Sequence, residues 1–167
     1  QALCSKQADP SEKTDMPDQS YLDWPFFEER HHRLAQDLER FATTQLSDLD
    51  LHVEDDEALD ANCREIVRRL ARADLLKTTC VLTEEGKFDV RSLCLSREIL
   101  GRHAGIVDFA YAMQGLGSGP ISLFGTREQR EAYLPGVIAG EKIAAFAPSE
   151  PDAGSDLASL KTAATRD

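Results

Sequence analysis

The chain has 167 residues, of which 41% are hydrophobic and 29% are charged. This composition is typical of a soluble globular domain, with enough length for the start of a second one. The formal net charge of −11 argues against nucleic-acid binding, because a phosphate backbone requires a basic surface. No stretch approaches the roughly 18 apolar residues of a membrane-spanning helix, and the N-terminus lacks the apolar core of a secretory signal.

Residues 1–22 are polar and contain two prolines, so we expect a disordered tail. Residues 26–45 follow with apolar side chains at helical spacing and predict the first helix. A second helix is predicted over 56–73, because acidic residues stand at its positive end. Its apolar stripe consists of Leu59, Cys63, Ile66, Val67 and Leu70. Four arginines outside that stripe are either a solvated face or an anion site: Arg64, Arg68, Arg69 and Arg72.

Residues 76–89 are irregular, and a third helix is predicted over 90–103, with apolar residues on two sides. The fourth helix, over 105–116, has a single charged residue and should be the most buried. Its shared apolar face consists of Ile106, Phe109, Ala110, Met113 and Leu116. The glycines and the proline of 115–120 are expected to loosen or end this helix and to let a ligand or another backbone approach.

Thr126 and Gln129 form a capping box that predicts the start of a short amphipathic helix. We expect Pro135 to break or restart this helix and Gly140 to end it. Residues 142–147 have no helical stripe and are predicted to form a buried strand. The four cysteines lack CxxC spacing and are expected to be buried free thiols: Cys4, Cys63, Cys80 and Cys94. The four histidines show no ligand spacing, so we expect surface or core-edge residues and no metal site.

A loop of small and polar residues, 145–156, follows the predicted strand. Its two prolines fix the backbone direction, and Gly154 permits close approach of a ligand. The amides of 154–156 could point at an anion, and Ser149 and Ser155 add hydroxyl groups. On physical grounds alone, an anion-binding loop and a plain surface turn remain equally open.

The run Glu150–Asp156, followed by Leu160-Lys161-Thr162, resembles the signature of the acyl-CoA dehydrogenase family. Residues 124–135 are similar to the family's G(T/S)xxQKxxYLP helix, and residues 97–103 to its EELAR helix. Gly140-Glu141-Lys142 resembles the turn before the family's strand. The resemblance covers about residues 55–167. It departs at residues 80–87, where the paired glycines of the family's VPExxGG loop are missing.

The resemblance implies a mainly α fold: an N-terminal helical domain over 23–142, then the first strands of an FAD-binding β-domain over 143–167. It implies FAD as cofactor and α,β-dehydrogenation of an acyl-CoA thioester as the reaction. The electron acceptor would be electron-transfer flavoprotein, and the intact protein a homodimer or homotetramer. The compartment would be a bacterial cytoplasm or the mitochondrial matrix.

Carried over by position, the residues lining the FAD site would be Phe146, Pro148, Ser149, Gly154 and Ser155. The Ser149 hydroxyl would bond the flavin edge near N5, and Ser155 would also meet the acyl-CoA. Tyr111 and Ala112 match the base of the acyl cavity, although Tyr111 could instead be a core aromatic residue.

No residue matches the family's catalytic base, and the place of Glu150 in the signature is structural. A strand at a chain end would leave an unpaired sheet edge, so we expect the gene to continue for roughly another 200 residues. Two alternatives stay open. The chain could come from an acyl-CoA oxidase or a flavin monooxygenase on the same fold, or it could be a non-catalytic helical interaction module.

Overall fold

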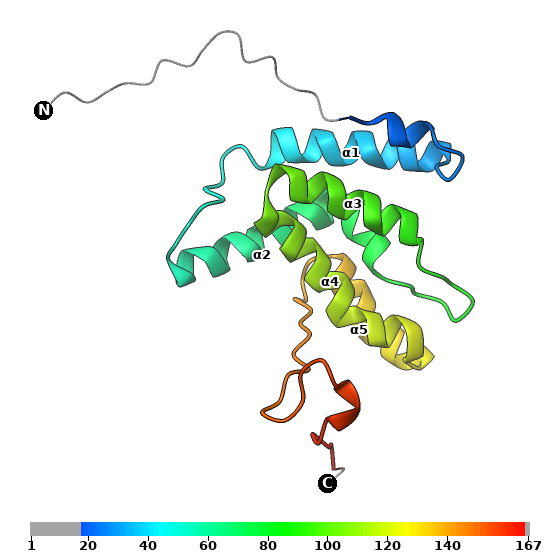
Figure 1. Ribbon diagram of the computed structural model, residues 1–167, viewed down its shortest axis with the longest axis vertical. Coiled ribbons are helices and arrows are strands. Elements are labelled where there is room, and N and C mark those ends of the chain that lie inside the picture. The colour runs from blue at the N-terminus through cyan, green and yellow to red at the C-terminus, as the bar shows by residue number, and fades with distance from the viewer. Residues whose placement is uncertain (1–17, 166–167) are drawn as a thin grey trace, which may run out of the picture.

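The computed structural model describes residues 18–165, and most of the predicted tail lies outside that range. Within it, the body consists of α1 (Glu29–Gln45), α2 (Asp56–Arg72), α3 (Val90–His103), α4 (Gly105–Phe124) and α5 (Arg127–Ile138). Short 3-10 helices occupy Ser20–Asp23, Leu75–Thr79 and Leu157–Ser159. The protein is therefore mainly helical, as predicted. Figure 1 shows α1 lying along α3, with α4 running from α3 toward α5.

The main hydrophobic core lies between the first four helices. Its fully buried side chains include Leu38, Ile66, Leu70, Leu100 and Val107. Leu22 also belongs to this core, so the packed body begins slightly before the predicted boundary at residue 23. A smaller cluster of Cys80, Leu134 and Val137 joins α5 to the segment before α3. Helix α4 contacts α2, α3 and α5, whereas α1 packs mainly on α3.

The helix starts follow from local chemistry. Asp55 caps α2 by accepting a hydrogen bond from the Ala58 amide at 2.9 Å. The predicted capping box of α5 is confirmed: the Thr126 amide donates to Gln129 Oε1 at 2.8 Å, and the Gln129 amide to Thr126 Oγ1 at 3.3 Å. Gly140, just after α5, has a φ of +69°, a left-handed conformation that favours glycine.

His31 is completely buried at the start of α1, whereas the sequence suggested a surface or core-edge position. Its Nδ1 accepts the Glu28 amide at 2.9 Å, which leaves Nε2 to donate to Asp89 at 3.1 Å. Asp89 stands immediately before α3. Both ring nitrogens are therefore used, and the ring ties the start of α1 to the start of α3. This pairing explains how an imidazole is tolerated in the core.

The prediction that α4 loosens or ends near residue 116 was wrong, because the helix continues to Phe124 with Pro120 inside it. Likewise α5 runs through Pro135. A proline removes one backbone donor, but tertiary packing of the flanking turns supplies most helical stability in proteins. The predicted apolar face of α4 also needs correction. Phe109 and Leu116 are 57% and 47% exposed, while Val107, Ala110 and Tyr111 face the core.

The predicted buried strand over 142–147 does not form within residues 18–165, where the β structure is one antiparallel bridge between Glu150 and Ala153. The segment lies extended without a neighbouring strand, and Ile143 and Phe146 are exposed. A β-strand needs backbone hydrogen bonds to a neighbouring strand, and no segment within residues 18–165 provides them. After this segment the chain leads away from the helical body (Figure 1).

The thiols are less uniform than expected. Cys80 is buried, Cys63 is half-buried and Cys94 is exposed, all three as free thiols. Cys4 lies outside the described residues. In the described part of the chain, no helix has the length and apolarity to cross a membrane.

Candidate functional site

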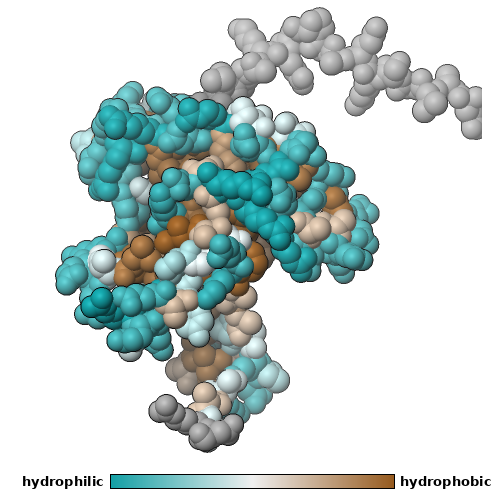
Figure 2. All heavy atoms as spheres, turned by 180° about the vertical axis from the view of Figure 1, so that it is seen from behind, coloured by the Kyte–Doolittle hydropathy of each residue, from teal (hydrophilic) through white to brown (hydrophobic). Residues whose placement is uncertain are grey.

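An apolar groove of about 620 Å³ runs along the exposed side of α4. Its wall includes Leu93, Phe109, Tyr111, Ala112, Leu116, Leu123, Phe124 and Phe146. Several of these side chains are largely exposed, with Phe124 at 85%. Figure 2 shows that apolar atoms reach the surface in the part of the helical body that adjoins the C-terminal segment. Exposed aromatic and aliphatic surface of this kind is typical of ligand-binding grooves and of protein–protein contacts.

The groove brings together residues that the resemblance assigned to two different ligands. Tyr111 and Ala112, from the predicted acyl cavity, share it with Phe146, from the predicted FAD site. The other predicted cofactor residues do not line this groove: Pro148, Ser149, Gly154 and Ser155. They lie further along the C-terminal segment, where Ser149, Gly154 and Ser155 are exposed.

Tyr111 belongs to the core as well as to the groove wall. Its side chain is 1% exposed, and its hydroxyl lies 2.7 Å from Thr78 Oγ1. Thr78 Oγ1 already donates to the Leu75 carbonyl at 2.9 Å, so Tyr111 is the donor to Thr78. Burial raises the pKa of the Tyr111 hydroxyl. The ring is thus held from its far end by the 3-10 helix Leu75–Thr79.

An ion pair stands at the polar part of the groove wall. Arg97 of α3 binds Asp108 of α4 through two parallel hydrogen bonds of 2.8 Å each. A bidentate pair of this kind fixes geometry as well as charge. This ion pair joins α3 and α4, the two helices that flank the groove. Because Phe109 follows Asp108 in the sequence, the pair also fixes the position of Phe109.

The loop after the extended segment is closed by Glu150. Its carboxylate accepts the Lys161 amide at 2.8 Å and the Thr162 amide at 2.9 Å. Its own amide donates to the Ala153 carbonyl at 2.8 Å. Hydrogen bonding, first from the Thr162 side chain and then from the two amides, lowers the pKa of Glu150. These bonds occupy both carboxylate oxygens and give Glu150 a structural part in the loop.

The same loop leaves donors free. Among the described residues, the amides of Gly154, Ser155 and Asp156 donate no hydrogen bond to another protein group. A Cβ added at Gly154 would meet nothing within 4 Å, so the backbone there is open to a ligand. Consecutive free amides beside exposed hydroxyls are the donors that a phosphate or pyrophosphate needs. The residues present therefore fit the anionic part of a dinucleotide.

Three polar side chains on the buried face of α4 form hydrogen bonds with the backbone of neighbouring segments. None of them was predicted from the sequence. Gln114, Ser118 and Ser122 are buried, each at most 2% exposed. Ser122 Oγ accepts the Val81 amide at 3.1 Å, and Gln114 bonds the segment after α5. Their spacing of four residues was the available signal, because it continues the stripe of Val107, Ala110 and Tyr111.

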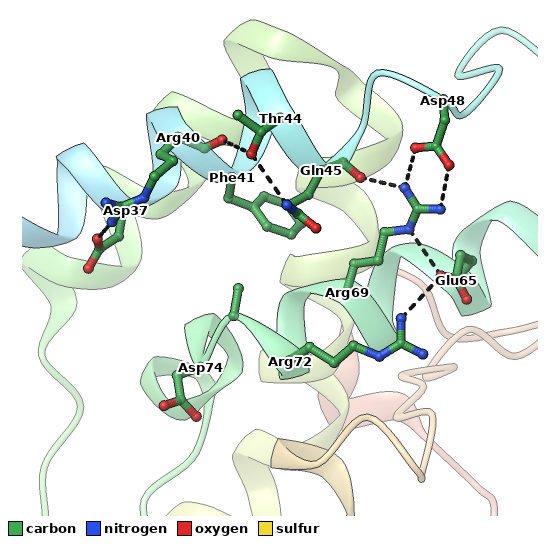
Figure 3. A pocket seen from close by; sticks show the side chains of 11 residues that line it. Asp37, Arg40, Phe41, Thr44, Gln45, Asp48, Glu65, Arg69, Arg72 and Asp74 are labelled. Carbon is green, nitrogen blue, oxygen red and sulfur yellow. Dashed lines mark hydrogen bonds and ion pairs between the residues drawn. The ribbon is translucent and has the colours of Figure 1, made fainter.

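A second hollow, of about 840 Å³ between α1 and α2, is polar (Figure 3). Arg69 binds Asp48 through bonds of 2.5 and 2.9 Å and Glu65 through one of 3.0 Å. Arg72 lies 3.6 Å from Glu65, and Arg40 pairs with Asp37. Each arginine that lines the hollow already has a carboxylate partner. Arg64, Arg68 and Arg72 are more than half exposed, as the solvated-face interpretation predicts, whereas Arg69 is 17% exposed and enclosed by its carboxylate partners.

Comparison with known proteins was consistent with these features. Residues 28–141 match the family model described as "Acyl-CoA dehydrogenase, N-terminal domain". The chain is 52% identical over 62 residues to "Probable acyl-CoA dehydrogenase" of Bacillus subtilis (strain 168), covering 36% of this chain and 10% of the relative. It is 47% identical over 68 residues to "Very long-chain specific acyl-CoA dehydrogenase, mitochondrial" of Homo sapiens, covering 40% and 10%.

A third relative is "Cyclohexane-1-carbonyl-CoA dehydrogenase" of Geobacter metallireducens, 39% identical over 75 residues, which are 45% of this chain and 20% of the relative. The chain thus spans about a tenth of the length of the first two relatives. The domain match, by contrast, covers more than half of the chain. This chain therefore belongs to the acyl-CoA dehydrogenase family, and residues 28–141 are its N-terminal domain.

Proposed function

We propose that the chain supplies the helical domain and one edge of the cofactor site of an FAD-dependent enzyme that dehydrogenates acyl-CoA thioesters between the α and β carbons. The observation that supports this most strongly is the shared groove. Tyr111 and Ala112 line it together with Phe146, which the resemblance assigns to the FAD site. An acyl chain lying along α4 would therefore reach toward the loop.

Each part of the site has a task in that reaction. The apolar wall binds the acyl chain and excludes water, at about 0.8 kcal/mol for each methylene that it buries. The free amides of residues 154–156 bind an anionic group, and Ser155 also contacts the acyl-CoA. Ser149 donates a hydrogen bond to the flavin edge. FAD, when bound, supplies the acceptor for the hydrogen that leaves as hydride. We assign no residue of this chain as the base that removes the α-proton.

The proposed partners and compartment follow the family. We propose electron-transfer flavoprotein as electron acceptor and a homodimer or homotetramer as the intact assembly. The Homo sapiens relative is named as mitochondrial and another relative comes from Bacillus subtilis, which supports the mitochondrial matrix or a bacterial cytoplasm.

The test is to express the product of the intact open reading frame and to measure bound FAD, acyl-CoA-dependent reduction of an artificial electron acceptor, and hydrogen peroxide. Reduction of the acceptor with little peroxide supports the dehydrogenase. Stoichiometric peroxide would identify an oxidase, and an oxygenated product a monooxygenase. A product without FAD, or a reading frame that stops naturally within a few residues of Asp167, would contradict the enzyme proposal and favour an interaction module.

Tyr111 provides a substrate-level test of the groove. We propose that its ring limits the acyl length, so that Tyr111→Ala in the intact product raises the relative kcat/KM for longer acyl-CoA chains by about tenfold or more. Tyr133→Ala is the matched control, because Tyr133 is half-exposed on α5 and lies outside the groove. An unchanged chain-length profile in Tyr111→Ala would remove the ring from the acyl site.

A further inference from the structure

Gln114 binds two backbone groups of the segment that leads from α5 into the cofactor loop, a segment that Lys142 also connects to α5 through hydrogen bonds from its amide to Gly136 and from its Nζ to Ala132. Gln114 Oε1 accepts the Ala144 amide at 2.7 Å, and Gln114 Nε2 donates to the Lys142 carbonyl at 3.1 Å. Nε2 also lies 3.4 Å from the Val137 carbonyl at the end of α5. The side chain is 1% exposed, so these bonds form away from water, where an unmade bond is costly.

The bonding pattern is that of a neighbouring strand. Lys142 and Ala144 flank Ile143, and their carbonyl and amide are the two groups that a residue of a parallel partner strand would bond. A carboxamide carries the same donor and acceptor as a peptide unit. Gln114 thus takes the place of a strand partner for a segment that has none among the described residues.

Gly117 adds a second point of contact on the same side of α4. A Cβ at residue 117 would lie 2.5 Å from the Ala145 amide nitrogen and 2.7 Å from its carbonyl oxygen. Real Cβ atoms do not approach so closely, so only glycine lets the Ala145 backbone rest on the helix here. Gln114 and Gly117 therefore fix two successive places immediately before Phe146.

We propose that Gln114 is a positioning residue that, together with Gly117, sets where the cofactor loop 145–156 starts relative to the groove. Gln114 touches no ligand itself. Its action is to hold residues 142–144 against α4, which orients Phe146 into the groove wall and the later loop residues beyond it. This inference rests on the proposed function insofar as the loop binds FAD, but the positioning itself is a property of this chain.

Amide hydrogen exchange, followed residue by residue by NMR on the 167-residue chain, tests the positioning. Gln114→Met keeps the volume and removes the bonds. We expect the Ala144 amide to exchange about tenfold faster or more, the effect of losing one buried hydrogen bond, while amides of α1–α3 keep their protection. Gln36→Met, at an exposed place on α1, is the matched control. Unchanged exchange at Ala144, or equal acceleration in every helix, would overturn the proposal.

Gly117→Ala tests the same idea without touching Gln114, and it remains informative if Gln114→Met fails to fold. Alanine favours a helix, yet its methyl group must displace Ala145, so the Ala144 amide should again lose protection by about tenfold. Gly119→Ala is the control on the same helix, because a Cβ there meets nothing within 4 Å. Equal protection of Ala144 in the two alanine variants would overturn the proposal.

A cofactor measurement separates this inference from the proposed function. In the product of the intact reading frame, Gln114→Met should weaken FAD binding by about tenfold, with no change in Gln36→Met. FAD affinity equal to wild type in Gln114→Met would show that the loop is placed without Gln114, and the inference would fail while the enzyme proposal stands. Absence of FAD from the wild-type product would defeat the enzyme proposal, and hydrogen exchange at Ala144 would still decide the positioning.

Discussion

Replacing Tyr111 measures how strongly the groove wall is coupled to the core. The ring is 1% exposed and packs within the main hydrophobic core, so Tyr111→Ala leaves a cavity. Truncating a buried aromatic residue in this way costs about 3–5 kcal/mol. Tyr111→Phe keeps the ring and removes only the donor to Thr78, which costs about 1 kcal/mol. The Thr78 hydroxyl still donates to the Leu75 carbonyl, so Tyr111→Phe leaves no hydroxyl donor without an acceptor.

Urea denaturation of the 167-residue chain, followed by circular dichroism, gives both values. With a slope of about 2 kcal/mol per molar urea, Tyr111→Ala should lower the midpoint by about 1.5–2.5 M and Tyr111→Phe by about 0.5 M. Tyr133→Phe is the control, because Tyr133 is half-exposed and makes no comparable bond. A loss below about 1 kcal/mol for Tyr111→Ala would refute the packing argument, since a core ring cannot be removed so cheaply.

Three further predictions concern the loop, a helix start and the flavin contact. Glu150 has a folded-state pKa below its ordinary value of 4.5, so its bonds persist above pH 4.5 and are lost as the pH falls through the folded value. The NMR shifts of the two amides it binds should therefore titrate below 4.5, and a midpoint at or above 4.5 would contradict this. Thr126→Ala should cost about 1 kcal/mol in thermal denaturation by removing the α5 cap, while Thr44→Ala, an exposed control, should stay within about 0.5 kcal/mol. Ser149→Ala in the intact product should slow anaerobic flavin reduction more than it weakens FAD binding, and equal reduction rates would exclude that role.

The sequence predicted those elements whose signals are local. The α5 cap depends on two side chains three residues apart, and the start of α2 on an acidic turn. The helical spacing of apolar residues predicted α1, and the stripe members Ile66, Val67 and Leu70 of α2 are core residues as predicted. The sequence also predicted the loop 145–156, but the structural role of Glu150 in it came from the family resemblance.

The features that escaped prediction depend on tertiary partners. Gly117, through which α4 continues, lies directly against the backbone of Ala145, which is far away in the sequence. The apolar residues Phe109 and Leu116 suggested a core face, but in the structure they form the groove wall. A hydrophobic pattern records which side chains avoid water, and it does not distinguish a core from a binding groove.

The two faces of α4 have a consequence for how such a protein can change. Val107, Tyr111 and Gln114 lie on a buried stripe, whereas Ala112 and Leu123 lie on the groove side and remain partly or largely exposed. Substitutions on the buried stripe alter folding, while a residue at 112 or 123 can become larger or smaller at little cost to the core. Tyr111 belongs to both faces, but at the other positions one helix keeps the residues that stabilise the domain apart from those that shape the proposed acyl groove, so the groove can vary while the core stays fixed.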